Sequence, residues 1–407
     1  MAYNLLLNII LLSGFVFAMG GKAEVPKPVR EDVQPVVEGN NYFCFNLYKN
    51  LAEKETGNIF YSPFSITMAI AMVFEGANGW TAEEMQDVFH FPEDSKIRQE
   101  SFFSLYQQLN KKNVRYKLNI ANALWVQKDY TLLQKYLKTI EKYYDGYAKN
   151  VDFIGATEQA RQTINKWVEG KTNDKIKDLF PPGSLNSNSR LVITNAIYFK
   201  GTWVKQFDKK LTTEDDFWTT ETKSVKVPMM RRTDPEAVYN YAETENLQIL
   251  ELPYEGDDLS MIVVLPNEKN LALIEKDLSI EKFEQWKALL SPVRVEVYLP
   301  RFTFRTRYNL TANLSMLGMP NSFAPHCDLS GIDGTKNLYI QSVVHQAYID
   351  VNEEGTEAAA ATGVVVGITS VGPRIPVFRA DHPFIFVIQD KNTGNILFIG
   401  RVVEPQA

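Results

Sequence analysis

The chain has 407 residues, of which 45% are hydrophobic and 12% aromatic, so one large mixed domain with a sizeable core is within its reach. This composition excludes an intrinsically disordered protein. The formal net charge of -6 makes the chain mildly acidic, which argues against nucleic acid or an anionic membrane as its partner.

The N-terminus has the pattern of a secretory signal peptide. Residues 5–18 are almost all apolar, the run is too short to span a bilayer, and small residues follow it. We place the signal peptide at residues 1–20, with cleavage after Ala18 or Gly20, although the segment before the apolar run lacks the usual Lys or Arg. No later stretch is long and apolar enough for a transmembrane helix. These features predict a secreted, extracellular protein.

Residues 21–39 have the composition of a flexible leader. They combine mixed charge with Pro26, Pro28 and Pro35, which favours an extended and poorly ordered segment. We therefore expect a single folded domain over residues 40–407.

Helices are predicted in the first part of this domain. A first amphipathic helix is indicated by apolar residues at helical spacing, namely Phe43, Leu47 and Leu51. A second helix follows Pro63, with Ser62 or Ser65 as its cap, and residues 66–74 are apolar on nearly every face. Such a helix must lie in the protein interior.

Two further helices are indicated by local patterns. Residues 81–84, Thr-Ala-Glu-Glu, match a capping box and predict the start of a third helix. Residues 158–172 form an amphipathic pattern with Ile164, Trp167 and Val168 on one face. This pattern predicts a surface helix.

Strands are predicted to dominate the rest of the chain. Residues 191–199 and 259–265 are apolar runs typical of buried strands. Between residues 293 and 304, Val293, Val295, Val297 and Leu299 alternate with polar residues, which predicts a half-buried strand. Residues 383–389 and 396–402 flank a turn-rich segment and predict a hairpin. Helices first and strands later, with no internal repeat, indicate a mixed α+β fold.

Two other sequence features bear on a secreted chain. The sequons at Asn309 and Asn313 predict N-glycosylation. Cys44 and Cys327 are too few for a disulfide scaffold, and they form either one disulfide or two free thiols. The apolar neighbours of Cys44 favour a buried thiol.

Enzyme signatures are missing from the sequence. It contains no Gly-x-Ser-x-Gly elbow, no phosphate-binding glycine loop and no His-Glu-x-x-His motif. The four histidines are scattered, and no Cys/His spacing resembles a metal site. We expect a protein that is not an enzyme and that uses no cofactor and no metal.

One segment is difficult to explain by packing alone. Residues 353–362 are rich in alanine, residues 363–370 have strand-like composition, and Pro373 and Pro376 then interrupt any regular structure. By composition the segment is either an alanine-rich helix with a loop after it or an exposed functional loop.

Four motifs decide between these interpretations, namely residues 58–66 (NIFYSPFSI), 194–203 (TNAIYFKGTW), 353–362 (EEGTEAAAAT) and 378–386 (FRADHPFIF). Together they resemble the serpin family, and the resemblance extends from residue 41 to residue 405. The resemblance implies an α+β fold with three mostly antiparallel sheets, about nine surrounding helices and an exposed reactive loop. It also implies a monomeric suicide-substrate inhibitor whose partner, a serine protease, becomes covalently trapped when the cleaved loop inserts into the central sheet.

The resemblance assigns a hinge at the start of the loop. Its residues are Glu353, Gly355, Thr356, Ala358, Ala360 and Thr362. Thr356 and the residues of the same parity, through Val366, would face inward once inserted, because side chains of a strand alternate between its two faces. All of them are small or β-branched and uncharged, whereas Glu357 has the opposite parity.

The scissile bond follows from the hinge by the family's spacing. Fourteen residues after Gly355 lies Thr369, so the reactive bond is assigned to Thr369 and Ser370. Ile368 and Arg374 remain as alternatives, because the loop is slightly longer than in short-looped members. We call the residue on the N-terminal side of the scissile bond the bait residue. A small bait residue implies an elastase-like target, whereas Arg374 would suit a trypsin-like protease.

Two supporting groups are also implied by the resemblance. Ser62, Ser65, Asn195 and His345 match a hydrogen-bonded cluster beneath the point where the strands of the central sheet part. Arg301 and Glu353 match a charge pair at the top of that sheet, near Trp203, in the region called the breach.

Other functions remain open at this point. A non-inhibitory serpin that acts as a carrier or chaperone would have a loop that is cut without inserting. A conventional hydrolase would turn over substrate and stay intact. A basic run of Lys111, Lys112, Arg115 and Lys117 is either a solvated edge or a weak site for a polyanion such as heparin.

Overall fold

The computed structural model describes residues 32–111, 115–356 and 375–406. In these ranges it contains ten α-helices and two short 3-10 helices, η1 (Lys209–Leu211) and η2 (Asn321–Phe323). The α-helices are α1 (Gln34–Ala52), α2 (Pro63–Phe74), α3 (Gly79–Phe89), α4 (Ser95–Leu109), α5 (Gln134–Tyr144), α6 (Thr157–Lys171), α7 (Ala272–Asp277), α8 (Ile280–Lys287), α9 (Thr311–Leu317) and α10 (Ser330–Asp333). None of these helices is both long and apolar enough to cross a membrane.

The strands of the described residues form three sheets, as expected. A six-stranded sheet has the order β12 (Phe302–Asn309), β13 (Ile340–Asn352), β14 (Gly355–Thr356), β4 (Leu191–Thr202), β2 (Tyr116–Gln127) and β3 (Tyr147–Val151). A seven-stranded sheet has the order β1 (Ile59–Tyr61), β17 (Ile396–Val402), β16 (Phe384–Asp390), β9 (Leu259–Pro266), β8 (Leu247–Pro253), β7 (Val238–Glu243) and β10 (Ser291–Arg294). A four-stranded sheet has the order β15 (Val377–Arg379), β11 (Glu296–Pro300), β6 (Ser224–Arg232) and β5 (Thr213–Trp218). Most neighbouring strands are antiparallel, which confirms the predicted α+β fold class.

Helix α2 lies in the interior between the two large sheets, because it contacts both β4 and β17. Ser62 caps it, accepting a 3.2 Å hydrogen bond from the Ser65 amide, and Pro63 occupies the first turn, where no amide donor is needed. Its residues are buried from Pro63 to Val73. The prediction of a buried second helix is confirmed.

The flexible leader predicted at residues 21–39 extends too far along the chain. Helix α1 begins at Gln34 rather than near residue 40, with Pro35 in its first turn. Val36 and Val37 are buried in the core, so their packing outweighs the loop-like composition of this segment.

The prediction that a capping box at residues 81–84 starts the third helix is also wrong. Helix α3 begins two residues earlier, at Gly79. The Thr81 hydroxyl accepts a 2.8 Å hydrogen bond from the Asp328 amide, and the Glu84 carboxylate accepts bonds from the amides of Asn321 and Ser322. These side chains therefore bind a distant loop instead of their own helix end.

The alternating segment at residues 293–304 was predicted to be one strand, but in the structure it is divided among three strands. It contributes β10, β11 and the start of β12, one strand to each of the three sheets, with Val295 and Arg301 at the two breaks. Val295, Val297 and Leu299 are buried, as the alternation predicted. Alternation is a local signal and does not reveal which neighbour a strand pairs with.

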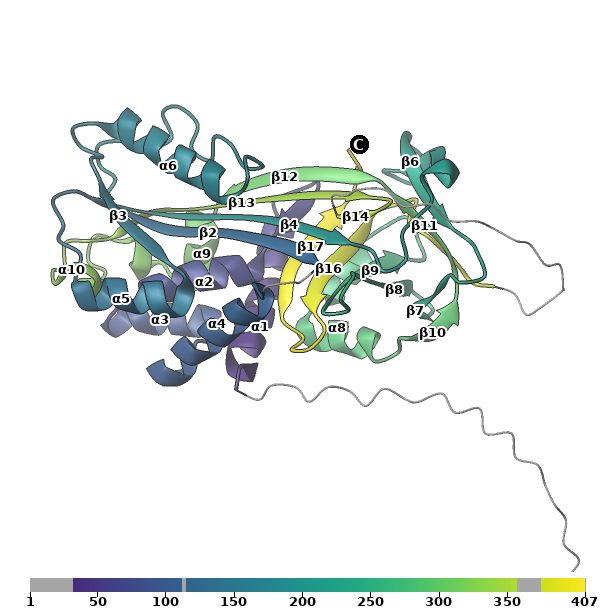
Figure 1. The fold of residues 1–407 in the computed structure, drawn as a ribbon, viewed down its shortest axis with the longest axis horizontal. Helices are drawn as coiled ribbons and strands as arrows, with labels where there is room; N and C mark the ends of the chain where they lie inside the picture. The colour runs from purple at the N-terminus through teal and green to yellow at the C-terminus, as the bar shows by residue number, and fades with distance from the viewer. Residues whose placement is uncertain (1–31, 112–114, 357–374, 407) are drawn as a thin grey trace, which may run out of the picture.

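Helix α6 covers the opposite face of the six-stranded sheet from the other helices of the N-terminal half (Figure 1). Ile164 and Val168 are buried against this face, and the Trp167 ring stacks on Tyr147 with centroids 5.2 Å apart. The predicted amphipathic helix is thus confirmed. The predicted hairpin is confirmed as well, by the antiparallel pair β16 and β17.

Both cysteines are free thiols that are buried, so no disulfide joins them. Cys44 lies in α1 and Cys327 precedes α10. Burial raises the pKa of the Cys44 thiol well above its usual value and that of Cys327 to about 11. Both thiols are therefore protonated and unreactive at neutral pH.

Candidate functional site

The candidate site is the seam between β4 and β13 in the middle of the six-stranded sheet. These two strands pair in parallel, with Leu191 opposite Ile340 at one end and Tyr198 opposite Tyr348 at the other. Their outer neighbours, β2 and β12, are antiparallel to them. Beyond Tyr198 and Tyr348 the two strands are no longer paired with each other, and another segment of the same chain lies between them.

The segment between them is β14, which consists of the hinge residues Gly355 and Thr356. Gly355 pairs with Asn352 of β13 and with Thr202 of β4, and Thr356 pairs with Val351 and Gly201. The start of the loop has therefore already entered the sheet. Ala358, Ala360 and Thr362 of the hinge and the reactive bond Thr369–Ser370 lie outside the described residues.

The two entered residues fit the hinge pattern. Gly355 has φ of +151°, and a Cβ atom there would lie 2.0 Å from the carbonyl oxygen of Gly201, so only glycine fits. Thr356 is completely buried, and its hydroxyl shares a 2.9 Å hydrogen bond with the Tyr254 hydroxyl. The prediction that Thr356 faces inward is confirmed.

The charge pair at the top of the sheet is present. The Glu353 side chain is fully buried, and its carboxylate accepts a 2.8 Å hydrogen bond from Arg301 Nε and another from the Thr212 hydroxyl. Burial pushes the pKa of Glu353 upward, but the hydrogen bonds from Arg301 and Thr212 outweigh this and hold the pKa below its usual value. Glu353 therefore remains ionised and fixes the point where the hinge leaves β13.

Trp203 closes the breach beside this pair. Its indole nitrogen donates a 3.0 Å hydrogen bond to the Asn352 carbonyl, and its amide donates to the Glu354 carbonyl at 2.9 Å. Its ring stacks on Tyr254 with centroids 4.5 Å apart. Trp203 therefore holds the backbone on both sides of Glu353 against the end of β4.

Sequence reasoning missed a second buried carboxylate in the breach. Glu354 is 3% exposed, and one of its oxygens is paired with Lys209. Its other oxygen, Oε2, has no hydrogen-bond partner among the described residues. The doublet of Glu353 and Glu354 was visible in the sequence, but the partner Lys209 is 145 residues away.

The predicted cluster beneath the seam is assembled from α2, β4 and β13. The Asn195 amide donates to the Ser65 carbonyl at 2.8 Å and to the Ser65 hydroxyl at 2.6 Å. The Ser62 amide donates to His345 Nε2 at 3.2 Å, and His345 Nδ1 lies against Asn195 Oδ1. All four side chains are completely buried, so the prediction that they lie together is confirmed.

Asn122 on β2 is a fifth member that sequence reasoning missed. Its side-chain oxygen accepts from Asn195, and it also lies 3.4 Å from the Ser65 hydroxyl. Asn122, Asn195 and His345 occupy one row across β2, β4 and β13. Asn122 interrupts the otherwise apolar residues 120–126 of β2, and this interruption was the available signal.

The hydrogen bonds fix the charge and tautomer of His345. Nε2 faces the Ser62 N–H and must accept, so the ring proton is on Nδ1 and is donated to Asn195. Burial lowers the pKa of His345 to about 3. A second proton would place an N–H opposite the Ser62 N–H and break the cluster.

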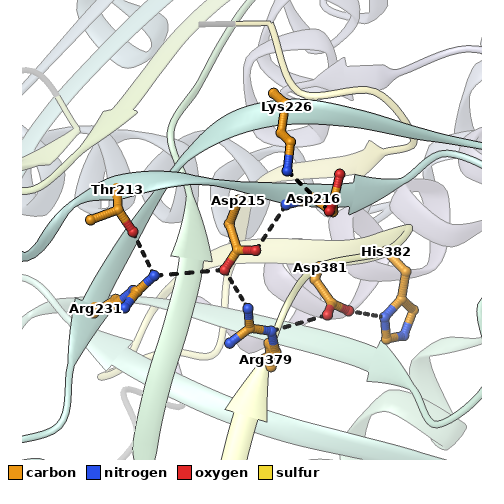
Figure 2. A network of polar contacts seen from close by, with 8 residues as sticks. All are labelled: Thr213, Asp215, Asp216, Lys226, Arg231, Arg379, Asp381 and His382. Atoms are coloured by element: carbon orange, nitrogen blue, oxygen red, sulfur yellow. Dashed lines mark hydrogen bonds and ion pairs between the residues drawn. The ribbon is translucent and has the colours of Figure 1, made fainter.

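The far end of the loop is anchored by β15, which pairs in parallel with β11. Figure 2 shows the polar network around this strand, where Arg379 bridges Asp215 of β5 and Asp381. Asp381 in turn lies 2.8 Å from His382 Nδ1, and His382 Nε2 contacts the Pro266 carbonyl. The described residues on both sides of the loop are therefore held firmly.

The two sequons differ in accessibility. Asn309 is exposed at the end of β12. Asn313 is buried, and its amide nitrogen, the atom that would carry a glycan, donates a 2.7 Å hydrogen bond to Asn50. Glycosylation at Asn313 would require this bond to break, so the geometry favours Asn309.

Three members of the basic run after α4 are described, and all three are exposed, namely Lys111, Arg115 and Lys117. The Arg115 guanidinium is paired with Glu255 at 3.6 Å, and Lys117 is exposed on β2. Lys112 lies outside the described residues.

We predict that acid destabilises the fold through His345. The unfolded histidine has a pKa of about 6.5, so between roughly pH 6.5 and pH 3 only the unfolded state takes up the proton. Stability is therefore lost as pH falls below about 6.5, by roughly 2 kcal/mol at pH 5 from this group. His345→Gln, although less stable at pH 7.5, should lose less free energy of unfolding between pH 7.5 and pH 5 in urea titrations. The exposed His326→Gln is the control, and equal losses in the wild type and His345→Gln would contradict the assignment.

We also predict that Glu353→Lys opens the top of the sheet. The change removes the ion pair and places an ammonium beside Arg301 in a buried site, at a cost of several kcal/mol. The variant should form polymers on mild heating, as measured by size-exclusion chromatography. Glu268→Lys, the same charge change at an exposed site, should remain monomeric, and a monomeric Glu353→Lys would refute the assigned role.

Comparisons with known proteins agree with this geometry. A family model described as Serpin (serine protease inhibitor) matches residues 38–405. An uncharacterized serpin-like protein of Methanosarcina acetivorans is 42% identical over 373 residues, which cover 91% of this chain and 86% of that protein. A leukocyte elastase inhibitor of Bos taurus is 42% identical over 376 residues, covering 90% of this chain and 98% of that protein. The crystal structure of uncleaved ovalbumin matches with a TM-score of 0.84 at 34% identity, over 91% of this chain and 100% of that one. By its sequence, its fold and the seam that its hinge enters, this chain belongs to the serpin family.

Proposed function

We propose that this chain is a secreted inhibitory serpin that traps a serine protease in a covalent complex. The observation that carries the proposal is the entry of Gly355 and Thr356 between β4 and β13, where they pair with both strands. The residues that follow at the inward parity, from Ala358 to Val366, are small or β-branched and uncharged. Insertion of these residues would therefore bury no unpaired charge in the sheet.

Insertion would extend an arrangement that already exists. Each residue added beyond Thr356 exchanges the direct pairing of β4 and β13 for two ladders, one on each side of the new strand. Each added backbone hydrogen bond contributes about 1 kcal/mol net. Burial of each inward-facing valine adds roughly 1.5–3 kcal/mol. Cleavage of the loop frees its end, so that this stabilisation becomes available.

The proposed mechanism uses the protease's own chemistry. Its nucleophilic serine attacks the carbonyl carbon of the bait residue, and the peptide bond to the next residue breaks to give an acyl-enzyme. The freed loop inserts before water hydrolyses the ester and carries the protease to the far end of the sheet. Loss of one oxyanion-hole donor slows such a hydrolysis by roughly 10²–10³, so distortion of the protease's site would stall it.

The bait residue suggests the class of target. Thr369 is small and β-branched, which fits the small pocket of an elastase-like protease. The name of the bovine relative, leukocyte elastase inhibitor, supports the same class. The signal-peptide pattern of residues 1–20 supports secretion, and the exposed Asn309 supports one N-glycan.

The first test is incubation with a panel of elastase-like and trypsin-like serine proteases. We predict a complex with an elastase-like protease that resists SDS, and release of a C-terminal peptide that begins at Ser370. A peptide that begins at Ile375 would identify Arg374 as the bait instead. Cleavage without any SDS-resistant complex across the panel would contradict the inhibitory function and favour a carrier or chaperone.

A second prediction concerns Thr356. Thr356→Arg puts a charge in a completely buried position against Tyr254, so the loop should be cleaved without trapping the protease. We expect the number of inhibitor molecules consumed per protease to rise by about a hundredfold or more, since a buried unpaired charge costs several kcal/mol and about 1.4 kcal/mol is a factor of ten. Glu357→Arg, at the opposite parity, is the matched control. If both variants inhibit as the wild type does, the hinge does not insert as proposed.

A further inference from the structure

A cavity lies at the far end of the seam from the hinge. Its lining includes Gln127 at the end of β2, Arg190 directly before β4 and Asn337 shortly before β13. Helix α10 contributes Asp333 to the lining and lies at the opposite end of the six-stranded sheet from β14 (Figure 1). The volume of about 440 Å³ is within the range of ligand pockets. This cavity has no part in the contacts that hold the hinge.

Arg190 is the basic residue of this cavity among the described residues that line it. Its Nη1 donates hydrogen bonds to the carbonyls of Ser187 at 2.8 Å and Ser189 at 3.0 Å. Its Nε and Nη2 have no hydrogen-bond partner among the described residues. These two nitrogens form one edge of the planar guanidinium, and such an edge matches the two oxygens of a carboxylate.

Two carboxylates also line the cavity, but neither is paired with Arg190. Asp129 accepts a 2.8 Å hydrogen bond from the Gln127 amide. Asp333 accepts bonds from the Thr335 amide at 2.9 Å and the Thr335 hydroxyl at 2.7 Å. The free edge of the Arg190 guanidinium is therefore available to an incoming carboxylate.

The register of β14 shows which part of the loop would reach the cavity. Gly355 lies opposite Thr202, and the two strands are antiparallel. Each further loop residue would therefore lie opposite the preceding residue of β4. Leu191 lies eleven residues before Thr202, at the start of β4. Val366 lies eleven residues after Gly355 and would therefore face Leu191.

Beyond the sheet, the same count places the bait residue Thr369 level with Asn188. The Arg190 guanidinium lies at this level, because its Nη1 contacts the carbonyls on either side of Asn188. From the other side of the seam, the Tyr339 hydroxyl donates a 3.3 Å hydrogen bond to the Asn188 carbonyl. An inserted loop would therefore bring Thr369 to Arg190.

Cleavage after Thr369 creates the group that Arg190 is placed to bind. Water adds across the peptide bond, so that Thr369 ends in a carboxylate and Ser370 begins with an ammonium. We propose that Arg190 binds this new carboxylate and holds the end of the inserted strand in the cleaved chain. The proposal rests on the proposed inhibitory function, because insertion delivers Thr369 to the cavity. In the acyl-enzyme the same carbonyl belongs to an uncharged ester, so Arg190 stabilises the hydrolysed chain more than the covalent complex.

The experiment compares strands that differ only in their end group. The uncleaved chain is incubated with a synthetic peptide that copies residues 356–369 and ends in either a carboxylate or an amide. Release of the bound peptide is then followed by native electrophoresis. The wild type should release the carboxylate peptide about ten times more slowly, because a bidentate charge-assisted pair is a strong hydrogen bond. Arg190→Gln should release both peptides at the same rate.

Two controls isolate the carboxylate from other effects of the substitution. A peptide of residues 356–364 would end opposite Ile193, three residues short of Arg190, so its end group should make no difference. Arg294→Gln, at an exposed arginine of β10, should keep the tenfold difference between the longer peptides. If Arg190 only held the turn before β4, Arg190→Gln would speed the release of both peptides and leave their ratio unchanged.

The outcomes separate this proposal from the inhibitory function. No uptake by the wild type, equal release of the two longer peptides, or a difference that persists in Arg190→Gln would overturn the role of Arg190. A difference that Arg190→Gln abolishes, together with no SDS-resistant protease complex, would retain that role and refute the inhibitory function. SDS-resistant complexes with no effect of the end group would do the reverse.

A second variant covers the case in which Arg190→Gln does not fold, judged by circular dichroism. Arg190→Lys keeps the charge and loses the planar edge with two donors. It should reduce the difference between the longer peptides from about tenfold to about threefold. An unchanged tenfold difference in this variant would overturn the assignment.

Discussion

The parallel pairing of β4 with β13 is the constraint on which the rest of the structure depends. Two long central strands meet directly from Leu191 to Tyr198, and only two residues of the following segment lie between them at one end. Because both strands have firm antiparallel neighbours on their outer sides, the seam is where the sheet can part without losing its other ladders. The hinge residues Gly355 and Thr356 lie at the open end of this seam, and β15 pairs with β11 where the described chain resumes.

The seam is held from its two faces by different chemistry. On the inner face, His345 of β13 is hydrogen-bonded to Asn195 of β4, and both are tied to the start of α2. On the outer face, Arg307 of β12 donates a 2.6 Å hydrogen bond to the Leu179 carbonyl, in the segment that follows α6. Polar contacts of this kind are directional, so they hold one arrangement firmly and fail together when the strands separate. An apolar contact at the same place is not directional, so its stabilisation would fall gradually as the strands move apart.

Sequence patterns predicted the elements whose cause is local, and the resemblance predicted the site. The all-apolar face of α2 and the hairpin of β16 and β17 followed from their own residues. The partners Asn122 and Lys209, the binding of a distant loop by Thr81, and the division of residues 293–304 among three sheets did not follow. Each depends on which segments meet in space, and that information is absent from local spacing.

The central claim is that the native sheet is held short of a more stable form, which it reaches by accepting its own loop. Thermal unfolding of the chain before and after cleavage within residues 357–374 tests this directly. The account predicts a large rise in the unfolding midpoint after cleavage, because the inserted strand adds two ladders of hydrogen bonds and buries its inward-facing side chains. A cleaved chain that unfolds at the same temperature as the intact one would contradict it.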